Sequence, residues 1–204
     1  MIPTPVIFVA GPSGAGKSQV SQWLEADLQL LHLDIDRHYG FGANGLRRQW
    51  DQFSRQLDPA PLMSALRDRI VAESRSGVVL SFPSTRILTR EQIDVARSAG
   101  ICTVILWGTE ELCKEARRAR ERTHGRTFDE KRYDKSNRKA FDTYGRSEYT
   151  DVRVEAFCPD GSRVRREQIV SIIRQRAVGR QALAADRANY AALLISSTLG
   201  WPGG

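Results

Sequence analysis

The sequence has few cysteines and no long apolar run. Its three cysteines, Cys102, Cys113 and Cys158, are widely spaced and form no C-x-x-C pair, which argues against a disulfide framework and a zinc site. Cys102 falls in an expected buried strand and Cys113 on an expected helix, where core packing explains both. No apolar stretch reaches the roughly 20 residues of a membrane-spanning helix, and the N-terminus lacks the features of a secretion signal. We therefore expect a cytoplasmic protein.

Positive charge is abundant and concentrated in one segment. The 204 residues, which fit one large domain, carry a formal net charge of +7. Between Lys114 and Lys139 there are 11 Lys or Arg residues against 5 Asp or Glu residues. Nearly all of the excess therefore lies in this segment, which is more typical of a local clamp for a polyanion than of a basic tail.

One stretch combines glycines with a lysine and a serine directly after an apolar run. Residues 11–18 read Gly-Pro-Ser-Gly-Ala-Gly-Lys-Ser and follow the apolar residues 6–10. The spacing G-x-x-x-x-G-K-S between a strand and a helix is that of the phosphate-binding P-loop. Glycines let the backbone turn its N–H groups toward a polyphosphate, which also meets the helix N-terminus. Lys17 would then reach the β- and γ-phosphates, and Ser18 would ligate Mg²⁺.

The chain lacks signatures that would assign this P-loop to other classes. It contains no Asn/Thr-Lys-x-Asp motif for reading guanine, which argues against a GTPase. The apolar run 78–80 ends in Ser81, where a conventional Walker B strand would end in aspartate. The chain is also short for the added helical subdomains of most motor ATPases.

Apolar runs alternate with amphipathic segments along the chain. Five runs have the character of buried strands, at 6–10, 28–33, 78–82, 101–107 and 152–157. Helical spacing is found between and after them, at 17–27, 46–57, 62–74, 89–99, 109–122, 136–144 and 165–178. This order predicts an α/β fold, a five-stranded parallel sheet sandwiched by helices. Residues 58–61 are expected to break a helix, and 124–134, which have little apolar content, to be irregular.

Two aspartates follow the second expected strand. Asp34 and Asp36 lie two residues apart, so their side chains leave the strand on the same side, at the edge of a parallel sheet where ligands bind. One carboxylate could hold a Mg²⁺-bound water, while the other orients or deprotonates an acceptor hydroxyl. The alternative is a capping role for the segment that follows.

The basic segment could close over a transferring phosphoryl group. Phosphoryl transfer builds negative charge on that group, so positive charge that covers it and excludes water stabilises the transition state. Arginines occur where such a lid is expected, at Arg117, Arg118, Arg120, Arg122, Arg126, Arg132 and Arg138. Glu115, Glu121 and Glu130 could instead pair with them at helical spacing, which would make the segment a solvated charged face.

Together these motifs resemble the small-molecule and nucleotide kinases of the P-loop superfamily, over roughly residues 6–178. Asp34-Ile35-Asp36 is similar to the D-x-D of shikimate-kinase-like enzymes. Residues 80–86, Leu-Ser-Phe-Pro-Ser-Thr-Arg, and 122–129, Arg-Thr-His-Gly-Arg-Thr-Phe-Asp, are similar to the acceptor-binding and lid segments of nucleoside monophosphate kinases. Two departures matter: Ser81 replaces an acid, and Ser84 replaces the arginine that would grip an acceptor phosphate, although Arg86 is close by.

The motif and the resemblance imply a site with ATP and Mg²⁺ as cofactors. The expected catalytic residues are Lys17, Asp34, Asp36, Arg122 and Arg126. The expected nucleotide contacts are Gly11, Ser13, Gly14, Ala15, Gly16, Lys17, Ser18, Gln19 and Arg118. The expected metal ligands are Ser18 and Asp34. We expect a small-molecule phosphoryl acceptor, no nucleic acid or membrane partner, and a monomer or homodimer.

The expected organisation is one P-loop kinase domain over 1–178 and a C-terminal helix and tail over 179–204. Within the domain, the lid is placed at about 117–138 and the acceptor region at about 37–60. In the family, the acceptor pocket would be lined by His38, Tyr39, Phe41, Arg47, Arg48 and Trp50. Trp50 and Phe53 also have the helical spacing of core residues, and His32, within an apolar run, is expected to pack in the core.

The sequence thus predicts an ATP-dependent kinase that transfers the γ-phosphoryl group to a hydroxyl of a small metabolite. A hydroxyl benefits from a carboxylate base such as Asp34 or Asp36, whereas a phosphate acceptor is already ionised and benefits from arginines. The alternative is a nucleoside or nucleoside monophosphate kinase. Two other classes stay open: a nucleic-acid-associated protein that contacts the phosphate backbone through 114–139, and a P-loop switch.

Overall fold

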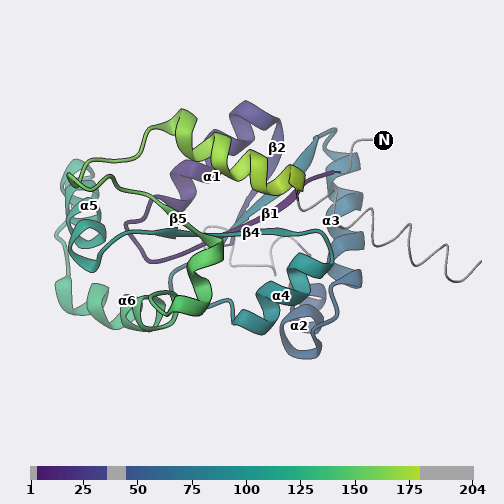
Figure 1. Ribbon diagram of the computed structural model, residues 1–204, viewed down its shortest axis with the longest axis horizontal. Coiled ribbons are helices and arrows are strands. Elements are labelled where there is room, and N and C mark those ends of the chain that lie inside the picture. Colours follow the sequence, from purple (N-terminus) through teal and green to yellow (C-terminus); the bar gives the residue numbers. More distant parts are fainter. Residues whose placement is uncertain (1–3, 36–44, 180–204) are drawn as a thin grey trace, which may run out of the picture.

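A five-stranded parallel sheet forms the centre of the molecule (Figure 1). The computed structural model describes residues 4–35 and 45–179. The strands are β1 (Val6–Ala10), β2 (Leu30–Asp34), β3 (Gly77–Ser81), β4 (Cys102–Trp107) and β5 (Arg153–Glu155). They lie in the order β2-β3-β1-β4-β5, and each neighbouring pair is parallel. The predicted α/β fold with a five-stranded parallel sheet is therefore confirmed.

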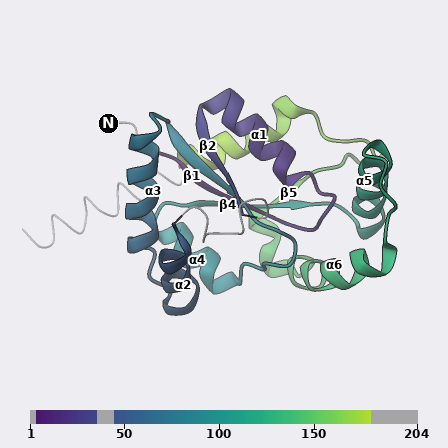
Figure 2. The ribbon, with the colours of Figure 1, turned by 180° about the vertical axis from the view of Figure 1, so that it is seen from behind.

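Helices cover both faces of the sheet, as the views from the two sides show (Figures 1 and 2). They are α1 (Lys17–Leu28), α2 (Arg47–Gln56), α3 (Ala60–Ala72), α4 (Arg90–Ser98), α5 (Glu110–Thr123) and α6 (Glu130–Tyr144), followed by a 3-10 helix at Ser147–Val152 and a helix at 166–179. One core cluster contains side chains of α2, α3, α4 and α6. The other contains side chains of α1, the first turns of α5 and residues 166–179.

The alternation of side chains along β1 divides these two clusters. Phe8 belongs to the α2–α3–α4–α6 cluster, while Ile7 and Val9 belong to the α1 cluster. All three are fully buried. A strand that is buried on both faces needs apolar residues at every position, which is why 6–10 is an uninterrupted apolar run.

Two helices begin earlier than predicted. Residues 124–134 were expected to be irregular, but α6 already begins at Glu130, so only 124–129 lie outside the helices. The side chain of Asp129 accepts a hydrogen bond of 3.0 Å from the backbone N–H of Arg132, which caps the helix; this cap outweighs the low apolar content. α3 begins at Ala60, within the expected breaker, because Pro61 is tolerated in a first helical turn.

The register of the sheet places the end of β2 beside the end of β3. Asp34 is paired with Ser81 across the two strands, and the backbone N–H of Ile35 donates to the Ser81 carbonyl at 3.2 Å. β1, which leads into residues 11–16, is the next strand. None of the helices in 4–35 and 45–179 combines the length and apolarity of a bilayer-spanning segment.

Candidate active site

Residues 11–16 form a tight loop between β1 and α1. Gly14 and Gly16 have φ of 93° and 92°, a region that favours glycine. A Cβ on Gly14 would also lie 2.0 Å from the carbonyl oxygen of Cys113, the residue of α5 beneath the loop. Lys17 Nζ donates to the carbonyls of Gly11 and Pro12 at 2.9 Å each. The loop and its lysine thus adopt a single compact arrangement at the N-terminus of α1.

Ser18, in the first turn of α1, contacts Asp34 at the end of β2. Ser18 Oγ donates to Asp34 Oδ2 at 3.4 Å, and Asp34 is 7% exposed. The neighbouring Ser81 has its hydroxyl 2.9 Å from His32 Nε2. His32 is therefore half-buried and hydrogen-bonded, rather than packed only among apolar groups. A carboxylate therefore lies at this edge of the sheet. It belongs to β2, whereas a conventional Walker B aspartate would end β3, where this chain has Ser81.

A polar cavity of about 540 Å³ opens above these residues. Lys17, Ser18 and Asp34 line it, and Arg117, Arg120 and Arg163 add positive charge to the lining. The other lining residues are Ser13, Gly14, Gly16, Gln19, Gln22, Ser81, Phe82, Pro83, Ser84, Thr85 and Ala116. The cavity thus joins the P-loop to the segment that follows β3, so one space is available to a polyphosphate and to a second small molecule.

The predicted lid arginines are distributed over several environments. Arg117 and Arg126 both pair with Glu121, at 2.6 and 2.8 Å. Arg118 lies 3.8 Å from Glu130 and its guanidinium stacks over Phe128. Arg122 is exposed. Of the predicted set, Arg117 and Arg120 line the cavity, whereas Arg118, Arg122 and Arg126 are not among its lining residues.

α6 is bonded directly to the P-loop. Asn137 Oδ1 accepts from the backbone N–H of Ser13 at 2.6 Å, and the Tyr133 hydroxyl donates to the Ser13 carbonyl at 3.0 Å. Asn137 is fully buried and its Nδ2 donates to the Tyr133 carbonyl at 2.9 Å. Burial raises the pKa of Tyr133, so its hydroxyl stays protonated as a donor. These two hydrogen bonds were not predicted from the sequence. The available signal was Asn137, a polar residue at helical spacing from Tyr133 and Ala140.

The site also contains an arginine that sequence reasoning missed. Arg163 lies in the loop after β5, where no motif marks it. Its guanidinium donates to the carbonyl of Gly14 at 2.5 Å. Arg163 reaches Gly14 because the chain turns back toward the P-loop after β5. No local sequence pattern predicts this turn.

The acceptor side is described in part. Asp36, His38, Tyr39 and Phe41 lie outside the described residues. Trp50 and Phe53 are buried in a cluster with Phe8 and Phe82, which is the core role. Arg47 and Arg48 line a separate shallow hollow on α2. Arg86 stacks over the Trp50 ring, 5.6 Å from its centroid.

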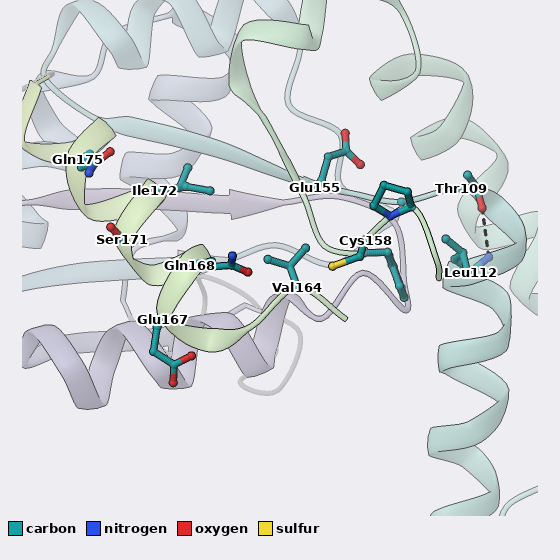
Figure 3. Close-up of a pocket in the computed structure, with 13 residues that line it drawn as sticks. Thr109, Leu112, Glu155, Cys158, Val164, Glu167, Gln168, Ser171, Ile172 and Gln175 are labelled. Atoms are coloured by element: carbon teal, nitrogen blue, oxygen red, sulfur yellow. Dashed lines mark hydrogen bonds between the residues drawn. The ribbon is translucent and has the colours of Figure 1, made fainter. Parts of the chain in front are cut away.

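A larger and more apolar cavity of about 1010 Å³ lies at the edge of the sheet, beside β5 (Figure 3). Its wall combines Leu112, Val164 and Ile172 with Glu155 and Glu167. None of the predicted site residues lines it. Because its charged lining residues are acidic, it is unsuited to a polyphosphate, and we place the candidate site at the smaller P-loop cavity.

A comparison with protein families gives one match. A family model described as an AAA domain matches residues 6–142, about two thirds of the chain. The chain belongs to this family. The AAA domain match runs from β1 through the P-loop and ends within α6. Arg163 and the loop that holds it lie beyond the AAA domain match.

Several solved structures resemble the chain at low identity. A gluconokinase from Sinorhizobium meliloti is 18% identical, with 92% of this chain and 97% of that chain covered and a TM-score of 0.48. A shikimate kinase from Acinetobacter baumannii in complex with shikimate is 19% identical, with 85% and 93% covered and a TM-score of 0.47. At these values neither carries an argument about activity. A search of curated proteins finds no match.

Proposed function

We propose that the protein is an ATP-dependent phosphotransferase that moves the γ-phosphoryl group to a hydroxyl of a small metabolite. The observation that carries the proposal is the contact between Ser18 of the P-loop and Asp34 at the end of β2. It joins a polyphosphate cradle to a carboxylate within one cavity. A protein that only bound nucleotide would need the cradle, but it would not need the cavity to continue past the carboxylate to Ser84 and Thr85.

The chemistry of the two oxygens fits Mg²⁺. The Ser18 hydroxyl and the Asp34 carboxylate are hard oxygen donors 3.4 Å apart, and Mg²⁺ in kinases is held by one or two such groups together with substrate phosphates. Within the described chain, no cluster of three or more His, Cys, Asp or Glu side chains could hold a metal by itself. When bound with ATP, Mg²⁺ would neutralise charge on the β- and γ-phosphates.

The protein's own groups would then divide the work. Lys17 is placed at the cradle, where its charge stabilises the polyphosphate. Asp34 is nine-tenths buried and stands between the cradle and the segment after β3, so it can orient an acceptor hydroxyl or accept its proton. Arg120 lines the cavity from α5, where its charge can offset the charge that develops on the transferring group.

Two variants test the proposal. Lys17→Ala should lower ADP release by at least about a hundredfold, while Lys139→Ala, which removes an exposed lysine of α6, should leave it unchanged. Asp34→Asn should lower turnover by about a hundredfold with a much smaller change in ATP affinity, measured by calorimetry. An active Lys17→Ala protein would contradict the mechanism, and full turnover by Asp34→Asn would make the carboxylate structural.

A panel of acceptors identifies the substrate class. The purified protein is incubated with ATP, Mg²⁺ and one compound from a set of sugars, sugar acids, shikimate-like polyols, nucleosides and nucleoside monophosphates, and ADP release is read. Stimulation by a hydroxylated metabolite supports the proposal, whereas stimulation by a nucleoside or monophosphate alone supports the alternative kinase. Oligonucleotide binding that falls steeply with salt, without any acceptor-dependent ADP release, would instead indicate a nucleic-acid-associated protein.

A further inference from the structure

A small hairpin turn after β5 presents Arg163 to the P-loop. Phe157 and Arg163 form an antiparallel bridge, and between them the Cys158 N–H donates to the Ser162 carbonyl at 2.7 Å. Asp160 Oδ1 accepts from the Ser162 N–H at 2.9 Å and from its hydroxyl at 2.6 Å. Gly161 supplies the positive φ of 83° that the turn requires. The one carboxylate of the turn is therefore used to hold the turn itself.

Two contacts hold the guanidinium of Arg163 beside the P-loop. It donates to the Gly14 carbonyl at 2.5 Å and lies 4.2 Å from the centroid of the Phe157 ring. It also lies 3.1 Å from the point where a Cβ on Gly16 would stand. The side chain is thus held against both glycines of the phosphate cradle, and it still lines the open cavity with Lys17.

The charge of Arg163 lacks the compensation that Arg117, Arg118 and Arg126 have. Arg117 and Arg126 pair with Glu121, and Arg118 lies near Glu130. Within 4–35 and 45–179, no acidic side chain forms an ion pair with Arg163. Desolvation by its surroundings lowers its pKa, although a guanidinium remains charged. A cation in this position is best satisfied by an anion that enters the cavity.

We propose that Arg163 is a phosphate-binding residue of the nucleotide site, provided from outside the AAA domain match. Its guanidinium acts on the bound polyphosphate through its charge, from the flank of the cradle formed by Gly14 and Gly16. The inference rests on the proposed function, because it requires that the P-loop cavity binds a nucleotide. It adds a cation that neither the P-loop motif nor the basic segment 114–139 contains.

The test compares ATP with inorganic tripolyphosphate, which has the phosphates without the base and sugar. Both are titrated by calorimetry, with Mg²⁺, into the wild type, Arg163→Gln, Arg163→Lys and Arg153→Gln. Arg153 is a matched control because it also stacks on an aromatic ring, 5.0 Å from the Trp107 centroid, and donates to a backbone carbonyl, that of Arg146. It is not among the residues that line the P-loop cavity.

Arg163→Gln should weaken both ligands by about tenfold, the effect of losing one charged hydrogen-bonding group, whereas Arg153→Gln should change neither. Arg163→Lys, which keeps the charge, should retain most of the affinity. Equal affinities of Arg163→Gln and wild type would overturn the proposal, as would a loss for ATP without a loss for tripolyphosphate, which would indicate a contact with the base. If the wild type binds neither ligand, the proposed function fails instead.

A second measurement uses the unaltered protein and so does not depend on how a variant folds. Arginines are modified with phenylglyoxal in the presence or absence of Mg²⁺-tripolyphosphate, and each site is quantified by mass spectrometry. Arg163 should be protected severalfold by tripolyphosphate, and Arg153 should react equally in both samples. Equal reactivity of Arg163 with and without tripolyphosphate would overturn the proposal.

Discussion

α5 and α6 follow β4 in succession and together make up most of the basic segment 114–139, yet they are held in different ways. The buried side chains of α5 are Cys113, in its first turns, and Glu121. Beyond Cys113, the side chains of α5 form ion pairs, such as Arg117–Glu121 within the helix and Lys114–Glu130 with α6. α6 buries Tyr133, Asn137, Ala140 and Tyr144, and the Tyr144 hydroxyl accepts from the Leu88 N–H at 2.8 Å.

The difference separates two tasks within the segment that the sequence marks only as basic. α6 fixes the P-loop through Ser13, so its polar groups act on the structure of the cradle. The outer half of α5 places Arg117 and Arg120 at the cavity without being built into the core. Few buried apolar contacts and exposed ion pairs are the properties of elements that can move at low cost in free energy. We therefore expect stability to depend on α6 and catalysis on the arginines of α5.

The largest effect on stability should come from α6. Asn137→Ala would leave the Ser13 N–H without its side-chain partner and remove the bond to the Tyr133 carbonyl. We expect the free energy of unfolding to fall by about 2 kcal/mol, measured by urea denaturation. Lys135→Ala, an exposed position on the same helix, is the control. A change in Asn137→Ala no larger than that of the control would show that α6 does not fix the loop.

An arginine of α5 should show the opposite pattern. Arg120→Ala should lower kcat/KM by about tenfold, which corresponds to about 1.4 kcal/mol of transition-state stabilisation, and leave the unfolding free energy unchanged. Steady-state kinetics and urea denaturation measure the two quantities. Arg122→Ala, on the same helix but outside the cavity lining, separates position from charge. A loss in Arg122→Ala as large as that in Arg120→Ala would favour the role predicted for Arg122 from the sequence.

A smaller effect is expected at the second bond between α6 and the P-loop. Tyr133→Phe removes only the hydroxyl that donates to the Ser13 carbonyl, so the unfolding free energy should fall by about 1 kcal/mol. The stacking partner Phe128 would keep its contact with the ring. Combined with Asn137→Ala in a double-mutant cycle, a nonzero interaction energy would show that the two bonds act as one unit; strict additivity would argue against a shared anchor.

Much of the fold follows from local patterns. The five strands are buried runs, and the helix expected at 89–99 begins at a capping box formed by Thr89 and Gln92. The contact between Ser18 and Asp34 could be anticipated because the carboxyl ends of all the strands in a parallel sheet lie at the same edge, although β3 lies between β1 and β2. The P-loop and Asp34 could therefore be predicted, because the first is a motif and the second directly follows an apolar run that forms a strand.

The rest of the site depends on long-range packing that no local pattern reports. Asn137 lies 124 positions from Ser13, and Arg163 lies 149 positions from Gly14. Among the lid arginines, Arg117 and Arg126 both pair with Glu121, which is only 7% exposed. Arg126 reaches Glu121 because the chain turns back after α5. Arg120 and Arg122 lie about 200° apart around a helix, but the sequence does not show which of the two faces the cavity.

The connections between the strands bear on how the selectivity of the proposed site could be re-engineered. The chain leaves the sheet after Asp34 and returns at Gly77, and between these points no described residue lines the P-loop cavity. The cavity wall near Arg117, Arg120 and Arg163 belongs to later segments. α2 and α3 of this connection contribute Trp50, Phe53 and Leu66 to the core, so they cannot be exchanged freely. Selectivity is better altered after β3, where Ser84 and Thr85 line the cavity and can be replaced while the cradle and its cations keep their places.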